Sequence, residues 1–261
     1  MNGFSMPGRT GAMLGLVLLL VAAGGCSSPD SGPETADAEA AAAGGRFDQR
    51  LDETLERRMA DNPVYAAVQR VAPERAAAWH RQVVTAYRSD GLSAAHAANL
   101  RISEEMGAWL SAEYAPRASD AALLAFYTEM QAVIAGPLSA RPRVCYSFLL
   151  GDPGSGIGQT EFAALDAVLG PFSHRLAGLV DGASDEPVAY DADRALAVQM
   201  AAADSAAAQA GDEALALLGE RVPSTEAEYR LACSGMAAYL GAILASEGRL
   251  DALRDFAAGP G

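Results

Sequence analysis

The 261-residue chain contains no lysine, because all 19 of its basic residues are arginine. This absence excludes Schiff-base chemistry, a phosphate-loop lysine and a serine–lysine nucleophile pair, all of which need an amine. Histidine is also scarce: only His80, His96 and His174 occur, and none belongs to an HxxxH or HExxH pattern. We therefore expect no helical two-histidine metal site and no cofactor.

Basic residues are also few compared with acidic ones. The 33 acidic residues outnumber the basic ones, and the formal net charge is −14. Such a chain lacks the basic face that phosphate contacts require, so no nucleic-acid partner is expected. Binding to anionic lipid through charge is excluded for the same reason.

The first 25 residues have the three parts of a secretory signal. Arg9 supplies a positive charge, residues 12–23 form an apolar run, and small residues follow it. The run is too short to cross about 30 Å of hydrocarbon as a helix. Residues 1–25 are therefore interpreted as a targeting segment and are left out of the fold.

The residues Ala23-Gly24-Gly25-Cys26 end this segment. They resemble the lipobox of bacterial lipoproteins, although Ala23 stands where that pattern usually has leucine. The resemblance implies that Cys26 is linked to diacylglycerol, that the chain is cleaved before it, and that the new amine is acylated. It also implies, through Ser27, the outer rather than the inner membrane. The alternative is an ordinary cleaved secretory signal with an incidental cysteine.

The segment after the lipid site is predicted to be a flexible tether, comprising residues 26–45. Residues 27–45 carry four acids, two prolines and no large apolar side chain, so they have nothing with which to build a core. Residues 46–261 then suffice for one well-buried domain or two small ones. We expect a single helical domain.

The domain is expected to be all-α, a single globular bundle of roughly eight to ten helices. Alanine is its commonest residue and the strongest helix former, and apolar residues recur at helical spacing. The run 144–150 suits a buried strand or a buried helix, and helix is preferred because no partner strand is apparent. Helices are expected at 47–59, after Asn62, from Pro73, from Leu92 to before Pro116, from Ser119 to before Gly136, and at 144–150, 159–169, 172–181, 191–218 with a break near Gly211, 224–247 and 249–257.

A disulfide is predicted between Cys145 and Cys233, the two cysteines that remain once Cys26 is lipidated. The periplasm is oxidising, so thiols that can meet usually pair. Cys233 shares a helical face with apolar residues, and Cys145 lies within the apolar run 144–150. Two separate buried thiols are the alternative.

Residues that could carry chemistry are few. Arg141 and Arg143 form a close basic pair that could contact an anion or a partner, or could belong to a plain turn. The glycine-rich stretch 151–158 precedes a helix and could hold an anion, but connectors between helices have the same composition. Ser234 lies within a helix and outside any GxSxG elbow, so no catalytic triad is expected.

These observations favour a non-catalytic, lipid-anchored protein that faces the periplasm and docks an envelope partner, as an assembly factor would. Two alternatives stay open: an envelope hydrolase that uses carboxylates or histidine, and a carrier with an apolar cavity for a lipid or small molecule.

Overall fold

The structure is a computed structural model that describes residues 53–54, 56–57, 59–150, 159–219 and 221–258. The all-α expectation is confirmed, and the number of helices agrees with the expected eight to ten. Over the described ranges there is no strand, only an isolated bridge between Ala118 and Ala183. None of the helices described there is long and apolar enough to cross a membrane.

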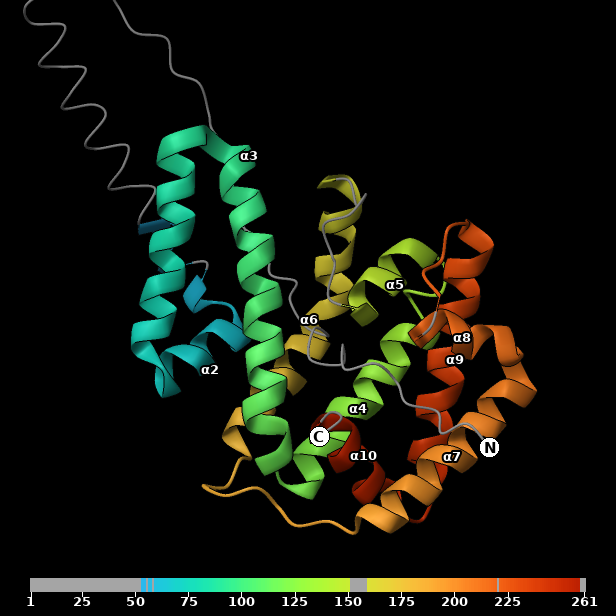
Figure 1. Ribbon diagram of the computed structural model, residues 1–261. Coiled ribbons are helices and arrows are strands. Elements are labelled where there is room, and N and C mark those ends of the chain that lie inside the picture. Colours follow the sequence, from blue (N-terminus) through green and yellow to red (C-terminus); the bar gives the residue numbers. More distant parts are fainter. Residues whose placement is uncertain (1–52, 55, 58, 151–158, 220, 259–261) are drawn as a thin grey trace, which may run out of the picture. The chain divides into compact units, whose positions relative to one another are not determined.

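Figure 1 shows the order of the helices along the chain. They are α2 (Pro63–Val71), α3 (Pro73–Tyr114), η2 (Ala115–Arg117, a 3-10 helix), α4 (Asp120–Ala135), α5 (Pro142–Leu150), α6 (Gln159–Asp181), α7 (Ala192–Ala210), α8 (Asp212–Gly219), α9 (Glu226–Ala245) and α10 (Arg249–Ala258). The described chain divides into two compact units, with the boundary between Asn99 and Leu100.

The smaller unit contains α2 and the first part of α3. Asn62 caps α2, because its side-chain oxygen accepts the backbone N–H groups of Val64 and Tyr65, each at 3.0 Å. The Tyr65 hydroxyl donates to the Ala76 carbonyl at 3.1 Å and so ties α2 to α3. Inside α3 the backbone is non-helical at Gly91, with φ 76° and ψ −159°, and Figure 1 shows two helical legs joined by a bend.

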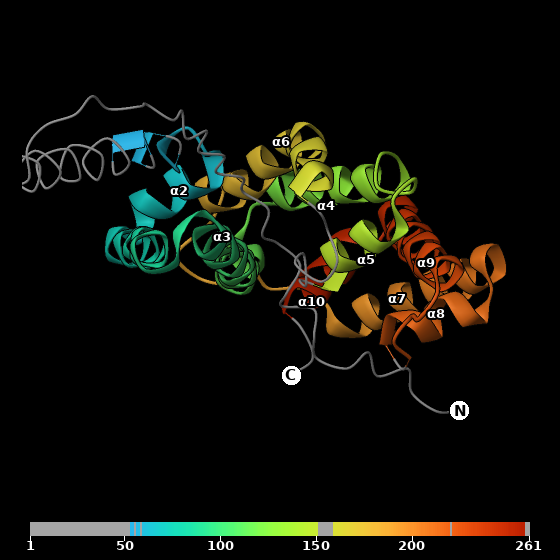
Figure 2. The ribbon, with the colours of Figure 1, turned by 90° about the horizontal axis from the view of Figure 1, so that it is seen from above.

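The larger unit is built around α9, which packs against α4, α5, α7 and α8. Figure 2 shows α9 between α4 and α5 on one side and α7 and α8 on the other. Close approach is possible because Gly235 of α9 faces α8: a Cβ there would lie 2.9 Å from the Ala214 Cβ. The helix begins with a capping box, in which the side chains of Thr225 and Glu228 each accept a hydrogen bond from the other's backbone N–H.

The core of this unit is aromatic at its centre. The Phe126 ring lies 5.0 Å from Tyr127 and 5.4 Å from Phe172, and Phe256 lies 5.8 Å from Tyr127 and 6.3 Å from Tyr239. Burial raises the pKa of the Tyr239 hydroxyl to about 12, with the Asp255 carboxylate adding to the effect. Helices α4, α6, α9 and α10 therefore meet at one cluster.

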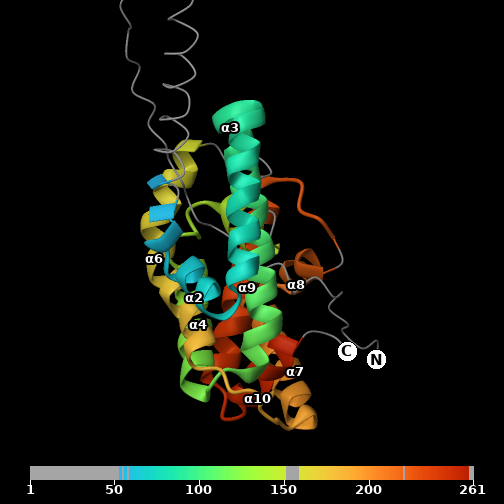
Figure 3. The same cartoon turned by 90° about the vertical axis from the view of Figure 1, so that its left-hand side faces the viewer.

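A buried arginine of α10, Arg254, bonds this helix to η2 and to the start of α4. Arg254 is 3% exposed, and its Nη2 donates to the Asp120 carboxylate at 2.6 Å and to the Ala118 carbonyl at 3.1 Å. Its Nη1 donates to the Pro116 carbonyl at 3.4 Å. This clamp fixes η2 and the start of α4 against α10, and Figure 3 shows α10 beside α7 and α4.

Two details differ from the sequence-based expectation. Residues 159–181 form one helix that continues through Pro171, where two helices were expected. The spacing of Leu196, Met200, Ala203, Ala207 and Ala210 predicts a stripe in tight contact with another helix, yet Leu196 and Met200 are each 56% exposed. Helix α7 is buried instead through its alanines, Ala195, Ala202 and Ala206.

Candidate functional site

An open cleft of about 1050 Å³ runs along α9 between α4 and α7, and it is here called the α9 groove. Both α4 and α7 pack against α9, so α9 is the floor and the other two helices are the walls. Its lining comprises Gln131, Ile134 and Ala135 of α4, Ser139 of the turn after α4, Ser205, Gln209 and Ala210 of α7, and Arg230, Leu231, Cys233, Ser234, Ala237, Ala238, Gly241, Ala242 and Ala245 of α9.

The floor of the groove is made of small side chains. From Ser234 to Ala245 every lining residue of α9 is serine, alanine or glycine, and the positions recur at the three- and four-residue spacing of one helix face. At a rise of about 1.5 Å per residue, the floor from Arg230 to Ala245 is roughly 22 Å long. A Cβ at Gly241 would meet the Gln131 Nε2 at 3.6 Å, an ordinary contact, so the groove has room there.

Arg230 is the one charged residue among those that line the groove. Its side chain is exposed, and it forms no ion pair with another residue of the described chain. Arg221, by contrast, pairs with Glu213 and Glu228, whereas the exposed Arg81 and Arg175 resemble Arg230 in having no ion pair with a described residue. The groove lining therefore contains one exposed cationic side chain, near the end where α9 begins.

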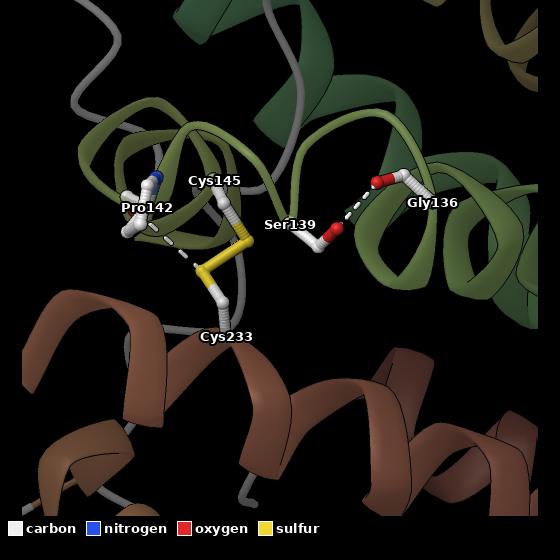
Figure 4. The surroundings of a disulfide bond; sticks show 5 residues. All are labelled: Gly136, Ser139, Pro142, Cys145 and Cys233. Carbon is white, nitrogen blue, oxygen red and sulfur yellow. Dashed lines mark hydrogen bonds between the residues drawn. A yellow bond between two sulfur atoms is a disulfide. The ribbon is translucent and has the colours of Figure 1, made fainter. Parts of the chain in front are cut away.

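The predicted cysteine pair lies near the Arg230 end of the groove, where Cys233 belongs to the lining. The sulfur atoms of Cys145 and Cys233 lie 2.13 Å apart, at disulfide distance, and their Cα atoms are 6.2 Å apart. The pair joins α5 to α9, and the Pro142 carbonyl oxygen lies 3.7 Å from the Cys233 sulfur (Figure 4). In the turn beside it, the Ser139 hydroxyl donates to the Gly136 carbonyl at 2.6 Å.

The arginine pair proposed from the sequence lies at the start of α5 and does not line the groove. Arg143 is already engaged, with its Nε 3.6 Å from the Glu226 carboxylate and its guanidinium 5.4 Å from the centre of the Tyr229 ring. Arg141 is half-buried, and its backbone N–H donates to the Leu138 carbonyl. Its role as an anion or partner contact stays a prediction.

The other candidates are dispersed. His80 is half-buried on α3 and His174 is exposed on α6, while the side chain of His96 lies outside the described part. Within the residues that the structure describes, no three side chains of histidine, cysteine, aspartate or glutamate are placed to hold a metal ion. The stretch 151–158 and the lipobox-like residues ending at Cys26 also lie outside the described residues.

A polar cluster between α7 and α10 was not anticipated from the sequence. The Asp255 carboxylate accepts hydrogen bonds from the Tyr190 hydroxyl and from the Gln199 amide, both at 3.0 Å. Burial and this hydrogen bond to Asp255 raise the pKa of Tyr190. Gln199 also donates to the Ala252 carbonyl at 3.1 Å, so the cluster holds two helices together.

No family model, curated protein or solved structure matches the chain.

Proposed function

We propose that this protein is a lipid-anchored protein of the bacterial envelope whose α9 groove docks a partner protein. The observation that carries the proposal is the groove itself, an open cleft flanked by α4 and α7 and floored by small residues of α9. An exposed concave surface with an apolar floor and a polar rim is typical of a binding site for another molecule.

The groove lining favours docking over hydrolysis. A hydrolase that uses histidine or carboxylates needs such a group within hydrogen-bond reach of the reacting atoms. The residues that line the groove include serine, glutamine and arginine but no histidine, aspartate or glutamate. Ser139 of the lining donates its hydroxyl to a backbone carbonyl, the usual role of a serine in a turn.

The anchor is proposed from the lipobox resemblance at Cys26. Two or more acyl chains give stable attachment, because each buried methylene contributes about 0.8 kcal/mol. We expect mass spectrometry of the mature N-terminus to find an acylated Cys26, and Cys26→Ser to release the protein from the membrane fraction. A mature N-terminus without acyl groups would refute the lipid anchor. The proposal that the α9 groove docks a partner does not depend on this result.

The docking role is tested by photo-cross-linking in cells that make the full chain. Benzoyl-phenylalanine in place of Ala238, on the groove floor, is expected to give an adduct with one protein. The matched control places the same residue at Ala201, which is exposed on α7 and outside the groove. A protein adduct from the control but not from the groove would overturn the proposal, and a lipid adduct from the groove would show a carrier instead.

A further inference from the structure

We propose that the disulfide between Cys145 and Cys233 is a site of thiol–disulfide exchange, at which an external thiol enters from the α9 groove and attacks the Cys233 sulfur. Cys145 then leaves as the thiolate. This inference goes beyond the docking of a partner protein and does not depend on it. It rests on two differences between the cysteines, namely their access to the groove and their places on their helices.

The first difference is access. Cys233 belongs to the lining of the α9 groove and is 3% exposed, whereas Cys145 is 0% exposed and is not part of that lining. The neighbours of Cys233 on the lining leave it approachable, because Ser234 is exposed and the small side chain of Ala237 lies one turn further along α9. A thiol in the groove therefore reaches the disulfide from the Cys233 side.

The second difference favours Cys145 as the leaving group. Cys145 is the fourth residue of α5, and its backbone N–H donates to the Arg141 carbonyl at 2.9 Å. Side chains lean toward the N-terminus of a helix, where the helix dipole favours negative charge. Arg141, four residues earlier in the chain, adds positive charge at this end of α5. A thiolate in such a place is stabilised, and exchange is faster when the departing thiolate is the more stable one.

Cys233 has the opposite setting. It is the eighth residue of the 20-residue helix α9, away from both helix ends. Its sulfur lies 3.7 Å from the Pro142 carbonyl oxygen (Figure 4), in a geometry that lets a thiol at this position donate to that carbonyl. Once released, Cys233 is therefore the cysteine that keeps its proton. Access and leaving-group stability thus direct attack to the same sulfur.

The exchange consists of two substitutions at sulfur. In the first, the thiolate of an external thiol bonds to the Cys233 sulfur, and the bond between the two cysteines breaks with its electron pair on Cys145. In the second, another external thiolate attacks the sulfur of the bound thiol, releases Cys233 and forms the oxidised thiol dimer. The protein disulfide gains two electrons from two thiols, whose protons pass through solvent to the cysteines. The covalent tie between α5 and α9 is then lost, while their packing remains.

The test uses the folded full chain carrying Cys26→Ser, so that Cys145 and Cys233 are the two cysteines present. Reduced glutathione is the probe, and N-ethylmaleimide traps free thiols at short reaction times. Cleavage after Arg143 and Arg230 places the two cysteines on different peptides, so mass spectrometry assigns the glutathione to one of them. We expect glutathione on Cys233 and maleimide on Cys145, in roughly fivefold or greater excess over the reverse pattern, as stabilisation of one thiolate at a helix end predicts.

The route through the groove is tested with Ala237→Leu, which places a larger side chain one turn from Cys233 on the lining. Ala201→Leu, at an exposed position of α7 outside the groove, is the matched control. We expect Ala237→Leu to lose most of the glutathione adduct and Ala201→Leu to retain it, with circular dichroism showing that both variants fold. In urea above the unfolding midpoint the preference for Cys233 should disappear, because the helices and the groove are lost together.

Three results would overturn the inference. Glutathione found mainly on Cys145, or equally on both cysteines, would refute the direction of attack. Reduction that is absent without urea and rises in step with unfolding would show a structural disulfide that opens only in the unfolded chain. An adduct on Cys233 that Ala237→Leu leaves undiminished would refute the groove as the route of the thiol.

Discussion

Two glycines on α9 provide a matched test of how closely its neighbours pack. Gly235 faces α8, where an added Cβ would lie 2.9 Å from the Ala214 Cβ and 3.2 Å from the Ala214 carbonyl oxygen. Gly241 faces the groove, where the nearest atom, the Gln131 Nε2, would be 3.6 Å away. The two sites share a helix, so Gly→Ala changes helix propensity equally at both and changes packing at one only.

The magnitudes follow from these distances. Within a helix, alanine is more favourable than glycine by about 0.8–1.0 kcal/mol. At Gly241 this gain stands alone, so Gly241→Ala should raise the free energy of unfolding by about that amount. At Gly235 the backbone of α8 must move, and overpacking of this kind costs about 1–3 kcal/mol. Gly235→Ala is therefore expected to be destabilising by up to about 2 kcal/mol after the propensity gain.

The assay is equilibrium unfolding in urea, followed by circular dichroism, for the parent chain and both variants. An unchanged slope with a shifted midpoint shows that stability alone has changed. The difference between the two variants is the decisive quantity, because the propensity term cancels in it. If both substitutions stabilise the chain equally, then α8 and α9 are not in the close contact that the structure describes, and the reasoning is refuted.

Three other local features can be tested in the same way. Replacing Cys145 and Cys233 together by alanine should lower the free energy of unfolding by up to about 4–5 kcal/mol in the chain-entropy model, given their separation of 88 residues, and urea unfolding of the variant beside the parent chain measures this. Hydrogen bonds from Ser224, and then from Thr225, lower the pKa of Glu228 to about 2, so this carboxylate stabilises the fold above its ordinary pKa of 4.5, and that contribution disappears as the pH falls toward 2. Glu228→Gln should therefore flatten the dependence of stability on pH between these values, and an unchanged acid-unfolding curve would contradict the assignment. Gly91→Ala should destabilise α3 by about 1–3 kcal/mol, because φ 76° with ψ −159° is a conformation open to glycine alone, and faster hydrogen exchange within residues 73–99 would report the loss.

Helix starts could be predicted because their signals are local. Asn62, Ser119 and Thr225 each cap a helix through a side chain that accepts a backbone N–H two or three residues onward, and this pattern is visible in the sequence. The pairing of Cys145 with Cys233 was also within reach, because two apolar helix faces had to meet in one core. Pro171 was misleading, since a proline usually ends a helix. Here Phe172 and Leu176 are buried just beyond it, and tertiary packing keeps the helix continuous.

The α9 groove could not be predicted because alanine occurs on every face of α7 and α9. Ala232 is buried while Ala238 lines the groove, yet nothing in the sequence separates the two. On α7 the buried alanines Ala195, Ala202 and Ala206 lie on a face about 100° around the helix from the stripe of Leu196 and Met200. The division near residue 99 has no linker signal either, because it falls within α3.

The Arg254 clamp has a consequence for the order in which the larger unit folds. Capped helices form within about a microsecond from neighbouring residues. Arg254, however, is 134 residues from Asp120 and 138 residues from Pro116, so this contact closes a very long loop. Closure of such a loop is unfavourable before other contacts exist, which places the clamp late in folding. Contacts made after the transition state slow unfolding rather than speed folding, so we expect loss of the Arg254 side chain to speed unfolding of the larger unit more than it slows folding.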